Sequence, residues 1–434
     1  MLIRFSIANF LSFKDLATLD LTADSLKEKR GNLNIPYFYN PDMALLKSVC
    51  IYGHNSYGKT NFIKAYAFFQ NFILSSFGKG THDEPIEVEP FIFNTAMNGK
   101  PSVFEVTFIL KETKYRYGFK ATKDIIIEEW LYYSETKIRE NFLFHRHGQE
   151  FTELSKSWNK DSNNKVEFAK PFAKDKILLL SVLLSQDGIL RIDKIRDWIK
   201  GNLVISNSSF GKLIKAKGGA AEIYASLEHR DTILKFIRKA DIGFSTVFDK
   251  IESVTRKGFA SEMAYSLYEK EQKNFELYTQ HDVFNEKYIK EKTIDILLEK
   301  NESSGSVKYF IISCFLTKAI KNAQLIWIDE LDASLHTDLF TMLIRIFNEP
   351  KNNSAGSQLI FTTHNTVMLN KQLRRDQIIF VHKNEFGESS LIAMHNPKKP
   401  VRIDKSVEQE YRQGKFEKGV SNKVPRNETP TLFT

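Results

Sequence analysis

Apolar positions follow two different periods along the chain, and each change of period marks an expected structural element. Residues 1–21 are expected to form two short strands, and residues 45–52 a buried strand. After Thr60, a helix is predicted by apolar residues that recur at helical spacing, namely Phe62, Tyr66, Phe69 and Ile73. The spacing makes these four side chains candidates for a core rather than for a ligand platform.

Between residues 103 and 133 the period changes to two, which predicts strands. Phe104, Val106 and Phe108 alternate with polar residues, and residues 114–120 alternate basic with aromatic side chains. Basic and aromatic residues in alternation could stack on nucleic-acid bases. The alternative, which we favour, is an antiparallel meander with one buried aromatic face.

Residues 140–295 carry no catalytic pattern, and we expect them to form a mainly helical insertion. Residues 177–199 and 222–239 are expected to be helical, with a loop at 215–221. Beyond residue 296 strong periodicity returns. The expected elements there are a helix at 308–319, strands at 325–328 and 359–362 with a helix at 337–347 between them, and strands at 378–381 and 391–393.

This pattern divides the chain into four expected segments. They are an N-terminal lobe at 1–139, the insertion at 140–295, a C-terminal lobe at 296–397, and a basic tail at 398–434. We expect the end of the tail to be loosely ordered.

Composition narrows the class of protein. A chain of 434 residues with 42% hydrophobic residues can build real cores, which excludes a disordered chain. Lys and Arg outnumber Asp and Glu by 62 to 53, which permits contact with nucleic acid without requiring it. Cys50 and Cys314 stand in apolar runs and are expected to be buried thiols in a reducing compartment. We see neither a secretory segment nor the ~20 apolar residues that span a membrane, so we expect a cytoplasmic protein.

Residues 53–60 carry the strongest chemical signal. The run Gly53-His54-Asn55-Ser56-Tyr57-Gly58-Lys59-Thr60 fits the pattern GxxxxGK[ST], with an apolar strand before it and a helix after it. Backbone N–H groups and the helix N-terminus of such a loop bind the phosphates of ATP. Lys59 would reach the β- and γ-phosphates, and the Thr60 hydroxyl would bind Mg²⁺.

A second set of candidates follows the strand expected at 325–328. Asp329 and Glu330 come directly after it, on the side where open α/β sheets bind ligands. Asp329 is expected to hold Mg²⁺, and Glu330 to polarise the attacking water. A surface Asp-Glu pair, the alternative, explains neither the apolar strand before them nor the D-loop-like run 331–336 after them. Asp332 in that run is counted with the nucleotide-binding candidates.

Two weaker motifs gain weight from their order in the chain. His364 closes an apolar strand in the position of a switch histidine that contacts the γ-phosphate; a structural histidine is the alternative. Ser303, Ser304 and Gly305 precede a predicted helix. Serine and glycine cap helices routinely, yet these residues also offer hydroxyls and a helix N-terminus to a γ-phosphate.

Taken in order, these motifs resemble the ABC-type ATPase heads of SMC, RecF and OLD proteins. The long separation between Lys59 and Gly305 argues against a transporter ATPase and is typical of the SMC-like group. The resemblance implies an α/β fold: a mixed β-sheet core with an antiparallel β lobe, carrying the mainly helical insertion. It also implies a homodimer or higher oligomer through the heads, in which the signature serves the opposing subunit's nucleotide.

A more specific resemblance is to the RloA/AbiL-type bacterial AAA ATP/GTP-binding proteins. Besides the phosphate loop, it rests on the runs 1–5, 9–13, 61–65, 115–119, 128–131, 240–243, 302–305 and 374–378. This resemblance implies an ATP-hydrolysing sensor or regulatory subunit of an anti-phage defence system. After His364 we find no carboxylate cluster fit for two metals, so we expect the nuclease or toxin activity in a separate effector protein.

Two departures from the family pattern and two alternative functions stay open. Tyr57 stands where such loops usually carry a small residue, and Ser304 and Ser306 replace residues of better-known signatures. A scaffold that binds ATP without hydrolysing it is therefore one alternative. The other is a DNA-binding repair or clamp ATPase of RecF/SMC type, which the positive charge favours and the lack of long heptad arms weakens. Nucleic acid thus stays open as a partner, as does the choice between ATP and GTP.

Overall fold

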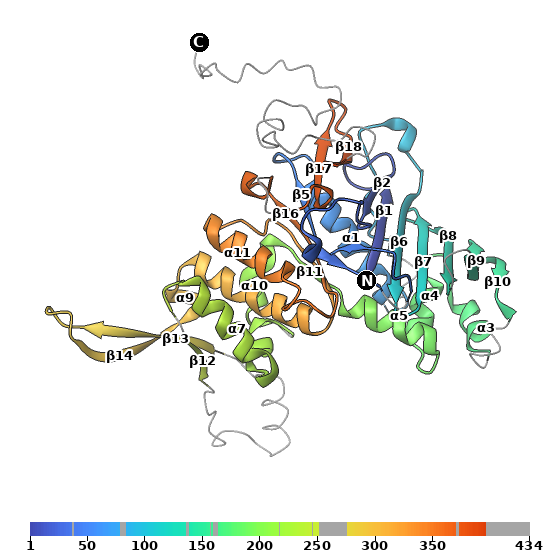
Figure 1. Ribbon diagram of the computed structural model, residues 1–434. Coiled ribbons are helices and arrows are strands. Elements are labelled where there is room, and N and C mark those ends of the chain that lie inside the picture. Colours follow the sequence, from blue (N-terminus) through green and yellow to red (C-terminus); the bar gives the residue numbers. More distant parts are fainter. Residues whose placement is uncertain are drawn as a thin grey trace, which may run out of the picture. The chain divides into compact units, whose positions relative to one another are not determined.

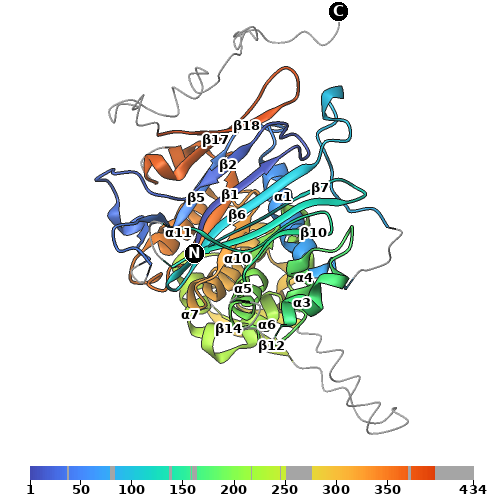
Figure 2. The same cartoon turned by 90° about the vertical axis from the view of Figure 1, so that its right-hand side faces the viewer.

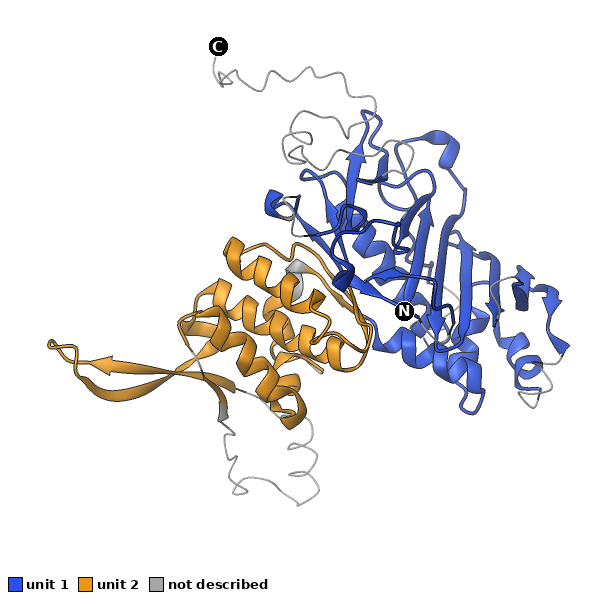
Figure 3. Ribbon diagram, viewed as in Figure 1, with its two compact units in different colours: residues 1–202, 360–434 blue, residues 203–359 orange. Residues whose placement is uncertain are grey.

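The computed structural model divides the chain into two units, residues 1–202 with 360–434 and residues 203–359 (Figure 3). The residues that the structure describes are 1–36, 39–78, 84–135, 139–156, 158, 164–216, 218–244, 246–250, 276–369 and 373–395. The tail expected at 398–434 lies outside them. The segment boundaries expected at 139, 295 and 397 stay predictions.

The period-two segment forms part of an antiparallel sheet in the first unit (Figure 1). Seven described strands form this sheet in the order β10-β9-β8-β7-β6-β1-β2, and all neighbours are antiparallel. Their bounds are β1 Leu2–Ala8, β2 Ala17–Asp20, β6 Ser102–Leu110, β7 Thr113–Ala121, β8 Ile126–Ser134, β9 Asn141–His147 and β10 Glu150–Leu154. Tyr115, Tyr117 and Phe119 of β7 are buried, so the meander interpretation is confirmed.

Helix α1 Lys59–Ser75 lies against this sheet (Figure 2), and aromatic side chains make the contact. The ring centroids of Phe62, Tyr66 and Phe69 lie 5.7, 5.1 and 5.5 Å from that of Phe5 in β1. Each such pair adds about 0.5–1.5 kcal/mol beyond the burial of its area. The predicted helical spacing is therefore confirmed, and it fixes α1 on the sheet.

A second group of strands in the first unit leads into and supports the phosphate loop. The fully buried β5 Ser48–Tyr52 pairs in parallel with β17 Ile378–Lys383, which pairs antiparallel with β18 Ser389–Ala393. The strand expected at 45–52 is divided into β5 and the short β4 Leu45–Leu46, which pairs with β3 Leu33–Asn34. The other elements of this unit are η1 Arg30–Asn32, η2 Thr95–Met97, α3 Lys165–Ala169, η3 Lys170–Phe172, α4 Leu179–Leu184, α5 Leu190–Gly201, η5 Thr366–Leu369 and η6 Arg375–Gln377.

A buried ion pair ties α4 to the sheet. Glu129 of β8 is fully buried and accepts from Arg146 Nε of β9 at 2.8 Å. The same carboxylate accepts from the backbone N–H groups of Leu179 and Leu180 at 2.8 and 3.0 Å, and from the Tyr117 hydroxyl at 3.0 Å. A buried charge is tolerated when it is paired and hydrogen-bonded in this way.

In the second unit, helices surround a short parallel pair of strands, β11 Leu203–Ile205 and β15 Leu325–Ile328. Strand β16 Gln358–Thr363 continues from this unit into the first. The remaining elements of the unit are η4 Asn207–Leu213, α6 Ala220–Ala225, α7 Leu227–Ala240, β12 Val247–Lys250, β13 Glu276–Phe284, β14 Lys290–Leu297, α9 Leu298–Asn301, α10 Ser304–Lys321 and α11 Thr337–Asn348.

The insertion differs from its prediction in three ways. The helix expected at 177–199 is two helices, α4 and α5, because Gly188 between them has φ +82°. The helix expected at 222–239 is interrupted at Ser226, whose extended backbone separates α6 from α7; α6 also takes the last two residues of the expected loop at 215–221. Strands β12, β13 and β14 form an antiparallel sheet that the sequence analysis did not predict.

Both cysteines are buried, as expected, Cys50 in β5 and Cys314 in α10. Burial raises the pKa of the Cys314 thiol well above its usual value. Among the described helices, none combines the length and apolar character needed to cross a membrane.

Candidate functional site

The phosphate loop joins the buried β5 to α1. His54, Asn55 and Ser56 are exposed, directly before the helix N-terminus where a phosphate group would bind. Gly58 has φ +111°, and a Cβ there would lie 2.5 Å from Ser389 Oγ. Only glycine fits this position without strain, since it has no Cβ. The loop therefore makes a turn at Gly58, directly before α1, that a residue with a side chain would strain.

Lys59 and His364, predicted from distant motifs, meet in the first unit. Lys59 is 4% exposed, and its Nζ donates to the backbone oxygens of Gly53 and His54 at 2.7 and 3.0 Å. The same nitrogen lies 3.2 Å from His364 Nδ1. An ammonium group only donates hydrogen bonds, so Nδ1 accepts and the ring proton of His364 is assigned to Nε2. Half-buried His364 thus keeps a donor on its other nitrogen.

Tyr57, the unusual loop residue, is packed between two histidine rings. Its ring centroid lies 5.2 Å from that of His54 and 6.2 Å from that of His382, both edge-on. Its backbone oxygen accepts from Ser389 Oγ at 2.6 Å. Thr60, half-buried in the first turn of α1, comes three residues later. Its contacts with the two histidine rings thus explain why a large aromatic residue can stand at position 57.

The run 374–378 anchors the strand that leads into the loop. Arg374 and Asp376 form a buried bidentate pair, with contacts of 2.7 and 2.9 Å. Gln377 donates to the Ser48 backbone oxygen at 2.8 Å and to its hydroxyl at 2.9 Å. Ser48 begins β5. The sequence analysis noted this run as part of a resemblance but missed its role as a support for the loop.

The two predicted carboxylates lie in the second unit, at the end of β15. Asp329 is 3% exposed, and its backbone N–H donates to Ile205 O of β11 at 2.9 Å. Glu330 is half-buried and has φ +48°, a left-handed conformation that is uncommon for residues other than glycine. The chain therefore turns sharply out of the direction of β15 at Glu330. Asp332, two residues later, is half-buried.

Lys308 of α10, which the sequence analysis missed, holds this turn. It is 5% exposed, and its Nζ donates to the Glu330 backbone oxygen at 2.8 Å and lies 4.5 Å from the centre of the Phe210 ring. Burial lowers the pKa of Lys308 to about 8, against the opposing effect of Asp332, Glu330 and Asp329. A lysine within the apolar run of a helix is the signal that could have identified it.

Ser303 and Ser304 are exposed at the N-terminus of α10. The Ser303 hydroxyl caps the helix, accepting from the Ser306 backbone N–H at 3.1 Å and donating to Ser306 Oγ at 2.9 Å. Ser306 Oγ in turn donates to Ile242 O at 2.9 Å. The capping alternative therefore accounts for the contacts of Ser303 that the structure describes.

Gly305 brings the signature against the D-loop-like run. A Cβ at Gly305 would lie 2.6 Å from the Ser334 backbone oxygen. Ser334 itself has φ +61°. Within this unit the structure thus joins two motifs, at Gly305 and Ser334, that are 29 positions apart in sequence, through a contact that only glycine permits.

Each unit holds part of the predicted set. The phosphate loop 53–60 and His364 belong to the first unit, and residues 303–305, 329, 330 and 332 belong to the second. Their nucleotide-binding and catalytic roles stay predictions.

A family model and two solved structures are similar to this chain. A family model described as "AAA domain, putative AbiEii toxin, Type IV TA system" matches residues 48–370. No curated protein sequence matches the chain. Two solved structures are similar at low identity. One is described as the crystal structure of the SmcHead bound to the C-winged helix domain of ScpA, with 12% identity, a TM-score of 0.45, and coverage of 90% of this chain and 96% of that one. The other is described as the recombination mediator protein RecF-ATPrS in the RecFOR pathway, with 11% identity, a TM-score of 0.32, and coverage of 91% and 98%.

Proposed function

The chain belongs to the family of AAA domains described as putative AbiEii toxin, type IV TA system, and we propose that it hydrolyses ATP as the regulatory subunit of an anti-phage defence system. An ATPase of the AAA/ABC type is what family membership supports. The defence role, the cytoplasm as its place and a separate effector protein are our proposal, drawn from the RloA/AbiL-type resemblance of the sequence.

The observation that carries the proposal is the contact between Lys59 and His364. The loop lysine is held at the loop by two backbone oxygens and by the histidine that directly follows β16. A phosphate chain would replace these acceptors, because it offers charged oxygens to the same ammonium group. His364 would then present Nε2–H toward the terminal phosphate. Binding and sensing of the phosphate would thus use one small group of side chains.

Residues of the second unit would supply the remaining chemistry. The Asp329 carboxylate is suited to Mg²⁺, which prefers oxygen ligands, and so is the Thr60 hydroxyl of the first unit. When bound, Mg²⁺ would neutralise charge on the phosphates. Glu330 would orient and polarise the attacking water, and Lys308 would keep the Glu330 backbone in its left-handed turn.

We further propose that two copies associate through their signature residues. Ser303 and Ser304 are exposed at the N-terminus of an 18-residue helix, where an approaching phosphate is stabilised. Ser303→Arg should leave ATP binding by the monomer intact and block ATP-dependent association. If Ser303→Arg still forms a dimer when ATP is added, this role of the signature is refuted.

A DNA clamp of RecF/SMC type is the competing function. The basic residues of β7 that could have contacted DNA are engaged in ion pairs: Lys114 and Arg116 with Glu140, and Lys120 with Glu128. Because acidic residues already pair with these basic side chains, the face of the sheet that carries them is a weaker candidate for binding DNA.

The test is ATP turnover by the wild type and by Glu330→Gln, with and without duplex DNA, on protein purified with and without a co-purifying effector protein. Turnover that depends on Glu330, is indifferent to DNA and changes with the co-purified partner supports the proposal. Turnover that rises sharply with DNA, together with salt-dependent duplex binding, would favour the clamp. Turnover absent in all preparations would favour a scaffold that binds ATP without hydrolysing it.

A further inference from the structure

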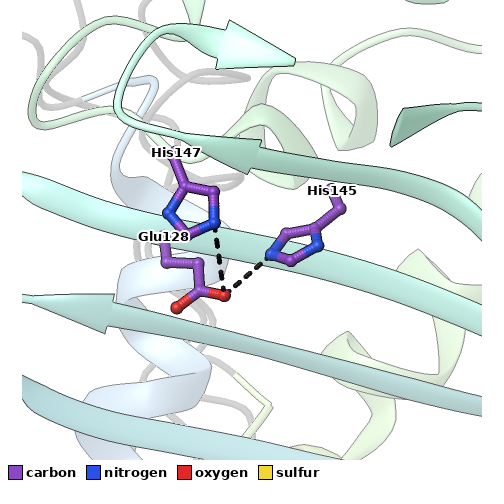
Figure 4. Close-up of side chains that lie close together, drawn as sticks. All are labelled: Glu128, His145 and His147. Atoms are coloured by element: carbon purple, nitrogen blue, oxygen red, sulfur yellow. Dashed lines mark hydrogen bonds and ion pairs between the residues drawn. The ribbon is translucent and has the colours of Figure 1, made fainter. Parts of the chain in front are cut away.

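Three metal-ligand side chains gather on one face of the antiparallel sheet, apart from the predicted nucleotide-binding residues (Figure 4). They are Glu128 of β8 and His145 and His147 of β9. Glu128 is paired directly with His147 across the two strands, and His145 stands two residues before His147. Alternate residues of a strand share a face, as do directly paired residues, so all three side chains project to the same side.

Their donor atoms have the spacing of a metal site. The three lie within 4.8 Å of one another, with Glu128 Oε1 2.8 Å from His145 Nε2 and 3.8 Å from His147 Nε2. Ligands bound tetrahedrally at about 2.0–2.1 Å from Zn²⁺ are about 3.4 Å apart. The two distances to Glu128 Oε1 lie on either side of this value, and the two histidine nitrogens lie within 4.8 Å of each other, so side-chain movements of about 1 Å would bring all three atoms to this spacing.

A further hydrogen-bond chain orients His145. The Tyr132 hydroxyl lies 3.3 Å from His145 Nδ1 and donates to Glu153 Oε2 at 3.5 Å. Because the Tyr132 hydroxyl donates its hydrogen bond to Glu153, its oxygen can accept a hydrogen bond from His145 Nδ1–H. Metal-binding histidines are usually held by their second nitrogen in this manner. This contact leaves Nε2 as the atom directed at Glu128.

One cation now competes for the carboxylate. Lys120 Nζ lies 2.5 Å from Glu128 Oε2, on the oxygen that does not face the histidines. The other oxygen, Oε1, accepts from His145. A metal ion would replace the proton that lies between His145 Nε2 and Glu128 Oε1. Lys120 would keep its contact with the other oxygen of Glu128, Oε2. The ammonium charge nearby would weaken metal binding without preventing it.

We propose that Glu128, His145 and His147 form a binding site for Zn²⁺. Two imidazoles and one carboxylate suit this ion, whereas Mg²⁺ prefers oxygen ligands. Three protein ligands leave the fourth position to water. Bound in this way, the ion joins β8 to β9 on the outer face of the sheet.

The test is a zinc titration of the full chain in competition with a chromogenic chelator, after removal of any affinity tag. We expect one ion per chain. His147→Ala should weaken binding at least about tenfold, since even the partners of metal ligands matter by 10–100-fold. His147 has a half-exposed side chain, which favours a folded variant. His336→Ala is the matched control, because that side chain is 75% exposed in the other unit.

Two more variants separate a metal site from a structural ion pair. Tyr132→Phe should weaken binding by about 10–100-fold if the hydroxyl orients His145. Lys120→Met should tighten binding, a gain that misfolding cannot produce. Zinc binding by the wild type that is weaker in His147→Ala than in His336→Ala supports the site. Absent binding, or equal affinities in those two variants, overturns it. Should His147→Ala lose its native circular dichroism, Lys120→Met decides, with unchanged affinity counting against the site.

Discussion

Lys59 Nζ lies 3.2 Å from His364 Nδ1, although the two residues are 305 positions apart in sequence. The contact joins the start of α1 to the end of β16 within the first unit. It gives the histidine a defined tautomer, with Nδ1 as acceptor. The proposed roles of the two side chains can therefore be separated by single substitutions.

Lys59→Ala should abolish nucleotide binding, and His364→Ala should preserve binding but slow hydrolysis about 10²-fold. The reason is that Lys59 would contact the phosphates in the bound state, whereas Nε2–H of His364 would matter most as charge develops in the transition state. Binding of a fluorescent ATP analogue and steady-state turnover measure the two effects. A His364→Ala variant that loses binding as Lys59→Ala does would contradict the division of roles.

Glu330→Gln should bind ATP and hydrolyse it about 10²–10⁴-fold more slowly, because the amide cannot accept a proton from water. Glutamine has the same shape, so the left-handed backbone at this position should persist. Single-turnover hydrolysis and light scattering with ATP should show slow chemistry and an accumulating dimer. Glu299→Gln, in the same unit, is the control. Full activity in Glu330→Gln would exclude this residue as the base.

Gly305→Ala should destabilise the second unit by about 1–3 kcal/mol, because the new Cβ would overlap the Ser334 backbone oxygen at 2.6 Å. Thermal denaturation measures the effect. Gly211→Ala is the control, since a Cβ at Gly211 would meet no atom within 4 Å. Equal melting temperatures for the two variants would show that the close approach is easily relieved.

Lys308 should make stability depend on pH between about 8 and 10.5. In this window the unfolded chain keeps the proton that the folded protein has released, so the free energy of unfolding should rise with pH. Lys308→Met lacks this contribution. The wild type should gain about 3 kcal/mol relative to Lys308→Met across the window, measured by denaturant titration at each pH. Parallel stability curves would mean that the lysine is not desolvated in the folded protein.

Arg146→Ala should cost about 3–5 kcal/mol of stability, because it leaves the fully buried Glu129 without its cation. Arg4→Ala removes a partner from the exposed pair with Asp20 and should cost no more than about 1 kcal/mol. Denaturant titration of both variants provides the comparison. Similar losses in the two would show that the Glu129 carboxylate is protonated or rehydrated in Arg146→Ala.

The parts of the fold that sequence patterns predicted are those governed by local periodicity. The aromatic side of α1 and the alternation in β7 each reflect one buried face, so the spacing of Phe62, Tyr66 and Phe69 was sufficient. The break at Ser226 carries no strong signal, because serine is tolerated in helices. Strand β14 is largely exposed and β13 buries only Leu277 and Thr279, and strands with so little buried surface lack the pattern on which the prediction depends.

The functional residues show the same limit. Each predicted candidate belongs to a contiguous motif, which a sequence displays directly. Lys308 acts through a backbone oxygen 22 positions away, and Glu128 meets His145 only through the register of β8 and β9. Such relationships depend on pairing between strands or packing between elements. The spacing of residues within one segment of the sequence does not indicate such contacts between segments.

The burial of Cys50 and Cys314 makes the chain suitable for site-directed crosslinking. The sequence contains two cysteines, and both are enclosed by core residues, so thiol reagents should react first with a cysteine placed on the surface. Ser303 is exposed at the tip of α10 and offers such a position. In a chain that carries both Ser303→Cys and Asn55→Cys, the latter in the exposed phosphate loop, a bifunctional maleimide would capture two chains when the signature of one approaches the loop of the other, without prior removal of the native thiols.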